Sequence, residues 1–149
     1  MSDVVLVAYG GSPSGEAALD RALQIAQRDS LRLHVLSVAD AIDIEGRTSA
    51  NREIQRMVGQ LEPLRARGRA LNIDVSVQVA EGDVATLISR VAQEQHVRLI
   101  VIGHRHRGSF RRLVDASVAK RALDRAPCEV LVVGMECRAS APDRCALHA

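Results

Sequence analysis

Aromatic residues are almost absent from this sequence, which contains no tryptophan, one tyrosine and one phenylalanine among 149 residues. Proteins that bind RNA or single-stranded DNA commonly stack the bases on aromatic side chains. Tyr9 and Phe110 alone offer little for such stacking, so no nucleic-acid partner is expected. Hydrophobic residues make up 47% of the chain, and the core must therefore be built from valine, leucine, isoleucine and alanine.

Long apolar runs and paired cysteines are also missing. No stretch approaches the ~18 apolar residues that span a bilayer, and no basic segment of a signal peptide precedes the first strand pattern. Cys128, Cys137 and Cys145 are odd in number and lack CxxC spacing, so the sequence indicates neither a disulfide framework nor a zinc site. We expect a cytoplasmic protein with no membrane partner.

Lysine is also scarce, because Lys120 is the single lysine of the chain against nineteen arginines. The segment from Gly103 to Arg125 holds seven basic residues against two acidic ones, a local net charge of +5. Because the whole chain carries +2, the remainder carries −3, and the positive charge is concentrated in this segment. Either the segment forms a solvated arginine-rich loop without a ligand, or it binds an anion.

Strand and helix patterns alternate along the chain. Near-continuous or alternating apolar runs predict five strands, at 4–9, 31–38, 73–79, 99–102 and 130–133. Helical spacing of apolar residues predicts four helices, at about 16–28, 52–67, 84–95 and 118–126. This alternation predicts an α/β fold, a three-layer sandwich whose five-stranded parallel sheet has the order 3-2-1-4-5.

Local features add detail to this outline. Ser14 and Asp83 are the predicted N-caps of the first and third helices. Pro63 predicts a kink or a break in the second helix, and the segment 40–49 before that helix is predicted to be a loop. The arginines of the second helix are assigned to its solvated face. His34, inside the second strand, is interpreted as a packed or surface histidine and not as a ligand.

Ligands of such sheets bind beyond the carboxyl ends of the strands, where the strand order reverses. Here that point lies between the first and fourth strands, and the two glycine-containing segments that follow them, 10–14 and 103–116, should meet in one crevice. Asp115 and Ser117 are both candidate N-caps of the helix behind the second segment, and a helix start favours negative charge. The candidate binding residues are Tyr9, Gly10, Val38, Gly103, His104, Arg105, His106, Arg107, Gly108, Ser109, Ser117 and Val118.

Other chemistries lack a complete set of residues. His104 and His106 form an H-x-H pair, but no third metal ligand is evident in the sequence. The G-x-S-x-G elbow of serine hydrolases and the Walker lysine pattern are absent. No catalytic or metal-binding residue is therefore predicted.

Three segments resemble the universal stress protein family: VVLVAYGGSPSGEAALDRAL, EGDVATLISRVAQEQHVRLIVIG and ASVAKRALDRAPCEVLVV. The resemblance covers about residues 3–133 and implies a Rossmann-like, adenine nucleotide alpha hydrolase-like domain over residues 1–134. Residues 135–149 have no pattern and are expected to form a mobile tail. The resemblance also implies an edge-to-edge homodimer through the strand at 130–133, although Glu129 stands where relatives often have proline.

The nucleotide-binding members of this family carry G-x2-G-x9-G-S/T after the fourth strand and an aspartate after the first. Gly103 and Ser117 match this motif at the right spacing. His106, Ala116 and Gly10 replace the second glycine, the third glycine and the aspartate. The resemblance thus implies a degenerate nucleotide motif, and a phosphate-like anion is favoured over ATP or AMP as the ligand.

Tyr9, beside the vacated aspartate position, either fills the base pocket or stacks on a base. The expected function is regulation through binding of a small phosphorylated ligand, in a stress-type protein that is not an enzyme. The alternative is an ATP- or AMP-binding stress protein with weak hydrolase or phosphotransferase activity, which the absence of convergent carboxylates for Mg²⁺ disfavours. A third interpretation is a degenerate domain that only pairs with a partner.

Overall fold

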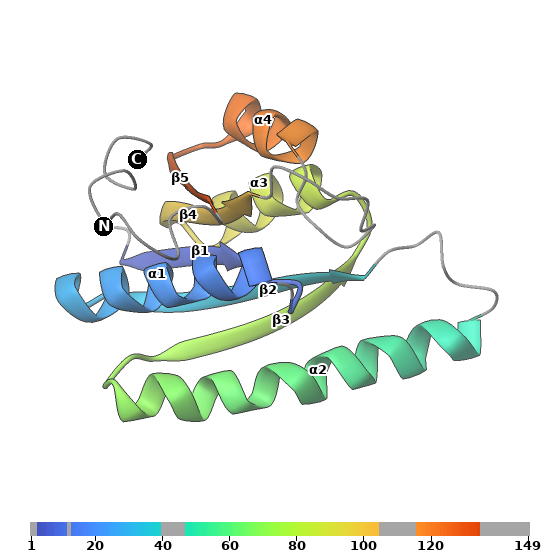
Figure 1. The fold of residues 1–149 in the computed structure, drawn as a ribbon. Coiled ribbons are helices and arrows are strands. Elements are labelled where there is room, and N and C mark those ends of the chain that lie inside the picture. The colour runs from blue at the N-terminus through green and yellow to red at the C-terminus, as the bar shows by residue number, and fades with distance from the viewer. Residues whose placement is uncertain (1–2, 12, 40–46, 105–115, 135–149) are drawn as a thin grey trace.

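The computed structural model describes residues 3–11, 13–39, 47–104 and 116–134, the side chains of 47–51, 53, 104 and 116–119 excepted. Strands and helices alternate along the chain, as predicted (Figure 1). Their bounds are β1 Val4–Ala8, α1 Pro13–Asp29, β2 Arg32–Ala39, α2 Arg47–Ala70, β3 Val75–Glu81, α3 Val84–Glu94, β4 Val97–His104, α4 Ala116–Arg125 and β5 Glu129–Gly134.

The five strands form one sheet in the order β3-β2-β1-β4-β5, and every neighbouring pair is parallel. This confirms the predicted α/β fold and strand order. In the central strand β1, Val5 pairs with Leu33 of β2 on one side and with Leu99 of β4 on the other. The carboxyl ends of β1 and β4 therefore lie side by side at one edge of the sheet.

Helices cover both faces of the sheet and make it a three-layer sandwich. Helices α1 and α2 lie on one face, and α3 and α4 on the other (Figure 1). Alternate residues of β1 supply the two cores: Val5 and Val7 join the cluster under α1 and α2, whereas Leu6 and Ala8 join the one under α3 and α4. All five residues of β1 are buried, which explains why this strand is an unbroken apolar run.

Helix α2 continues through Pro63, so the predicted break is wrong. A proline inside a helix costs about 3 kcal/mol because it lacks a donor and its ring crowds the preceding turn. Here Pro63 is exposed, whereas Leu61 and Leu64 on either side of it are buried against the sheet. Their burial holds the helix together on both sides of the proline. Helix α2 also begins inside the predicted loop 40–49, of which residues 40–46 lie outside the described residues.

The predicted helix caps have mixed outcomes. Asp83 is the N-cap of α3, where its carboxylate accepts hydrogen bonds from the Thr86 N–H at 3.0 Å and the Thr86 hydroxyl at 2.7 Å. Ser14 is not an N-cap, because α1 begins one residue earlier at Pro13 and Ser14 is buried in its first turn. Ser117 likewise falls inside the first turn of α4, and the other candidate cap, Asp115, lies outside the described residues.

His34 is a packed histidine, one of the two alternatives, packed or surface, that the sequence left open. It is buried in β2, with Nδ1 2.6 Å from the Ser76 hydroxyl and Nε2 2.8 Å from the Gln78 side-chain oxygen. Both partners belong to β3, so the imidazole links the two strands through its two nitrogens.

Candidate functional site

The carboxyl end of β4 makes a close backbone contact with the start of α1. Gly103, near the end of β4, lies directly against Ser14 in the first turn of α1. A Cβ atom added at Gly103 would lie within 2.6 Å of the Ser14 carbonyl carbon, a separation that real side chains do not tolerate. Only glycine allows this approach. The first glycine of the sequence motif therefore brings the helix that follows β1 onto the end of β4.

The backbone before α1 has a second glycine requirement. Gly11 has φ +77°, in the left-handed region that favours glycine. Gly10 beside it is exposed, and no side chain occupies the position where the family motif has an aspartate. The described residues Gly10 and Gly11 therefore bring no carboxylate to the end of β1.

The predicted binding residues are distributed unevenly. Gly103 is buried, and His104 is the last residue of β4. Ser117 and Val118 stand in the first turn of α4. Five further candidates lie outside the described residues: Arg105, His106, Arg107, Gly108 and Ser109.

Tyr9 and Val38 belong to different faces of the sheet. The Tyr9 ring packs against the cluster under α1 and α2, and its hydroxyl donates a hydrogen bond to the carboxylate of Glu16 in α1. Val38 packs against the other cluster, under α3 and α4. Burial and the neighbouring Glu16 carboxylate both raise the pKa of Tyr9. In this arrangement the Tyr9 hydroxyl binds α1, and the side chains of Tyr9 and Val38 pack on opposite faces of the sheet.

Sequence reasoning missed the ion-pair network that continues from Tyr9. Arg67 of α2 lies with Nη1 3.7 Å from the Glu16 carboxylate, and its Nη2 donates to the carboxylate of Asp20. The network thus joins the end of β1 to α1 and α2. Arg67 is exposed, as its assignment to a solvated face requires, but the helical pattern alone carries no signal of a partner on another helix.

A second network holds α4 in place. Arg121 of α4 donates to the Asp83 carboxylate at 2.8 Å, and Arg125 reaches the Thr86 hydroxyl at 3.3 Å. The Ser89 hydroxyl donates to the backbone carbonyl of Arg125 at 3.0 Å. Hydrogen bonds from Thr86, and then from Arg121, lower the pKa of Asp83. The cap of α3 therefore also positions α4, the helix whose first turn contains the motif serine Ser117.

Metal and membrane sites are not found in the part of the chain that the structure describes. Within those residues, no three histidines, cysteines, aspartates or glutamates come close enough together to hold a metal ion. None of the described helices is both long and apolar enough to cross a bilayer. Cys128 is half-buried and its burial raises the pKa of the thiol, while Cys137 and Cys145 lie outside the described residues.

Comparison with known protein families identifies the family of this chain. The model of the universal stress protein family matches residues 1–134. The chain belongs to this family. The match ends where the predicted tail, residues 135–149, begins. Family membership confirms the resemblance that the three sequence segments carried.

Individual relatives agree with this membership. A universal stress protein of Methanocaldococcus jannaschii is 27% identical over 137 residues, which are 87% of this chain and 80% of the relative. A solved structure from the family in Burkholderia pseudomallei is 33% identical, with a TM-score of 0.68 over 88% of this chain and 95% of that one. A universal stress protein solved in complex with cAMP has a TM-score of 0.66 at 21% identity, over 90% of this chain and 98% of that one, and so shares the fold.

Proposed function

We propose that this universal stress protein is a regulatory protein that binds a small phosphorylated ligand at the carboxyl ends of β1 and β4. The observation that carries the proposal is the contact of Gly103 with Ser14, which seats the start of α1 beside the end of β4. Because the strands are parallel, the start of α4 follows at the same edge. A helix start carries a partial positive charge, so the starts of α1 and α4 together favour an anion there.

The ligand of one structural neighbour is consistent with a phosphate-bearing ligand for this chain. One neighbour of the same fold was solved in complex with cAMP. In the present chain Gly10 replaces the aspartate of the motif and is exposed, so the nucleoside has no carboxylate to accept its hydrogen bonds. The affinity is therefore expected to come from the phosphate, helped by Arg105 and Arg107 in the basic segment. The ligand class is inorganic phosphate or a nucleotide held mainly through its phosphates.

We further propose that the protein acts by binding and not by catalysis. Phosphoryl transfer commonly requires carboxylates that hold Mg²⁺ beside the phosphates. Two described carboxylates follow strands of the sheet, and both already have partners. Glu16, in the first turn of α1, binds Tyr9 and Arg67. Asp83, the cap of α3, binds Thr86 and Arg121. We also propose that the protein is cytoplasmic, because its sequence carries no disulfide framework.

Calorimetric titration with phosphate, AMP, ATP and adenosine tests this function. The double variant Arg105→Ala, Arg107→Ala should weaken phosphate binding by about 2 to 4 kcal/mol, since each arginine contributes a charged hydrogen bond. The matched control is Arg52→Ala, Arg69→Ala, which removes two exposed arginines of α2 and should leave binding unchanged. Equal affinity for adenosine and ATP, with no effect of either double variant, contradicts the proposal. Steady release of phosphate from ATP would establish the weak hydrolase instead.

We propose that the protein is a homodimer that pairs through β5. Val130, Leu131, Val132 and Val133 are all half-buried, and in the described part of the chain β5 pairs only with β4. An edge strand of this composition offers unpaired backbone groups that proteins usually cover. Light scattering of the purified chain at micromolar concentration should give the mass of a dimer, and the mass of a monomer would contradict this arrangement.

A further inference from the structure

Helices α3 and α4 lie on the same face of the sheet but differ in how they are anchored to it. The buried side chains of α3 are Ala85, Leu87, Ile88, Val91 and Ala92. Among residues 120–125, the part of α4 whose side chains the structure describes, only Ala122 is buried, and Leu123 is 50% exposed. Burial of apolar surface therefore holds α3 on the sheet much more strongly than it holds this part of α4.

Polar contacts with α3 supply a second anchor for α4. The Asp83 carboxylate accepts a hydrogen bond from Arg121 at 2.8 Å. The Thr86 hydroxyl accepts one from Arg125 at 3.3 Å, and the Ser89 hydroxyl donates one to the Arg125 carbonyl at 3.0 Å. We call these three contacts the α3–α4 clasp. They reach the second half of α4 and leave its first turn, where Ser117 stands, to the carboxyl edge of the sheet.

Asp83 connects the clasp with that edge. It follows β3 at the same edge of the parallel sheet at which α4 begins, and its carboxylate also caps α3. We propose that Asp83 and Arg121 are positioning residues, which set the phosphate affinity by fixing the start of α4 beside the ends of β1 and β4. This inference rests on the proposed function. An exposed ion pair adds little to the stability of the whole chain, so its role is to be measured at the site and in α4 itself.

Asp83→Asn separates positioning from charge. Asparagine is as good an N-cap as aspartate, so α3 keeps its start, while the charged bond to Arg121 becomes a neutral one. Loss of a negative charge would by itself strengthen the binding of an anion. The clasp predicts the opposite, a fall of about two- to fivefold in phosphate affinity by calorimetry, a range set by the small energy of an exposed pair. Unchanged or tighter binding would overturn the proposal.

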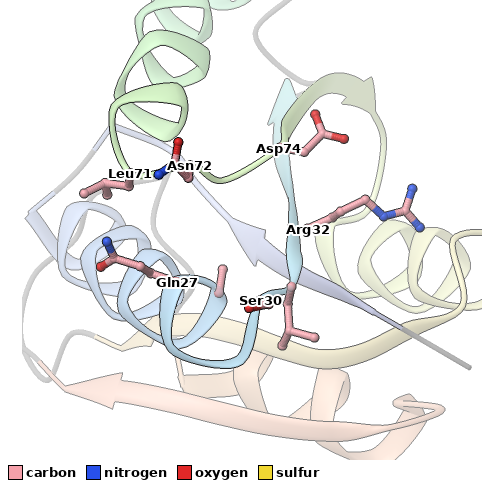
Figure 2. Close-up of a pocket in the computed structure, with 8 residues that line it drawn as sticks. Gln27, Ser30, Arg32, Leu71, Asn72 and Asp74 are labelled. Carbon is pink, nitrogen blue, oxygen red and sulfur yellow. The ribbon is translucent and has the colours of Figure 1, made fainter.

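Asp74→Asn is the matched control for this variant. The two aspartates lie beyond opposite ends of β3, and Asp74 lines a hollow at the amino end of the sheet together with Arg32 (Figure 2). The substitution removes the same charge without touching the clasp, so phosphate affinity should not change. An equal loss in Asp74→Asn and Asp83→Asn would contradict a role that depends on α4.

Substitutions of Arg121 test the other partner. Arg121→Gln should also weaken phosphate binding, and its combination with Asp83→Asn should lose little more than either change alone, because both remove one interaction. Arg121→Lys, which keeps the charge of the pair, should retain most of the affinity. Lys120→Gln removes a charge from the neighbouring position, which is not part of the clasp. Additive losses in the double variant, or an equal loss in Lys120→Gln, would mean that Arg121 acts through its charge alone.

Hydrogen exchange tests the clasp without a ligand. In Asp83→Asn the backbone amides of residues 120–125 should exchange faster than in the parent chain, whereas those of β1 and β4 should not change, because the core beneath them is intact. Unchanged exchange in α4 would show that Asp83 does not position this helix. If the parent chain binds no phosphate, the proposed function fails, and the exchange result still decides whether Asp83 holds α4.

Discussion

The junctions between helices and strands differ in geometry between the two ends of the sheet. At the amino end, three helices pass into strands with one geometry: Ser30, Asn72 and His96 have φ of 55°, 56° and 51°. The residue after each of them, Leu31, Ile73 or Val97, is buried at or just before the start of the next strand. At the carboxyl end no two described junctions are alike. The junction from β1 to α1 depends on Gly11 and on the contact of α1 with Gly103. The junction from β3 to α3 depends on the Asp83 cap.

This difference follows from the chemistry of helix ends. The last carbonyls of a helix can be satisfied by backbone N–H groups of the turn that follows, so one backbone geometry serves any sequence. The first N–H groups have no such backbone partner and need side chains, water or a ligand. The carboxyl end of a parallel sheet is where helices begin, and its junctions therefore carry the individual residues and the proposed anion site.

Gly103→Ala should be the most damaging single change at the carboxyl end. The new Cβ would meet the Ser14 carbonyl, a backbone group that cannot rotate away. We expect a loss of about 2 to 4 kcal/mol in the free energy of unfolding, measured by urea denaturation. At the amino end, Gly68→Ala should also be costly but less so, because the nearest atom to the added Cβ is a side-chain atom, Val75 Cγ2 at 2.1 Å, and the nearest backbone atom, the Ile73 carbonyl oxygen, lies 3.1 Å away.

Gly134→Ala is the control for both glycines, because no atom lies within 4 Å of the added Cβ. Its unfolding free energy should stay within about 0.5 kcal/mol of the parent chain. If Gly103→Ala is as harmless as this control, the close contact between β4 and α1 does not exist in solution, and the proposed phosphate site loses its main support.

Tyr9→Phe should have the next largest effect. It removes the hydrogen bond to the Glu16 carboxylate and should cost about 1.5 to 3 kcal/mol, the range for hydrogen bonds to charged groups. Because the folded state raises the pKa of Tyr9, this contribution is complete below the unfolded pKa of about 10 and declines as the pH rises above it. Denaturation of both proteins at neutral and alkaline pH measures the decline.

Tyr9 is the sole tyrosine of the chain, so ultraviolet absorbance follows its ionisation directly. In the folded protein the phenolate should appear only well above pH 10, and in urea near about pH 10. An ordinary titration in the folded protein would show that the hydroxyl is not held by Glu16.

Asp83→Ala should cost about 1 kcal/mol at neutral pH, the typical value of an N-cap, because the exposed pair with Arg121 adds little. The pKa of Asp83 is lowered in the folded state. Its contribution is therefore present above the unfolded value of about 3.9 and disappears as the pH falls through the folded value. Thermal melts at neutral and acid pH should show the difference from the parent chain shrinking in acid, with Asp124→Ala as the exposed control.

The smallest expected effect is a gain at the amino end. His96 has φ 51°, which costs a side-chain-bearing residue energy that glycine does not pay. His96→Gly should therefore raise the unfolding free energy by about 0.5 to 1 kcal/mol. Asn72→Gly should gain less, because asparagine tolerates this region better. A loss of stability in both variants would mean that these side chains have contacts that outweigh the strain.

The sequence by itself determined the class of fold and the family. Five apolar strand patterns separated by helical ones allow only a parallel sheet with crossover helices, and handedness and strand burial follow from that alternation. The Asp83 cap was also predictable, because a cap depends on residues within a few places along the chain, whereas the partners of His34 lie on β3 and were not. The predicted end of the fourth strand, at residue 102, falls two residues short of the end of β4 at His104.

Tertiary structure alone decided how the ends of the strands are joined to the helices. The sequence left two roles open for Tyr9, and the fold turns its hydroxyl to Glu16 instead. Pro63 lies in a continuous helix because Leu61 and Leu64 are buried on either side of it. Arg121 reaches Asp83 across 38 positions of sequence. Each of these outcomes is a contact between distant segments, and its energy exists only once the sheet has brought those segments together.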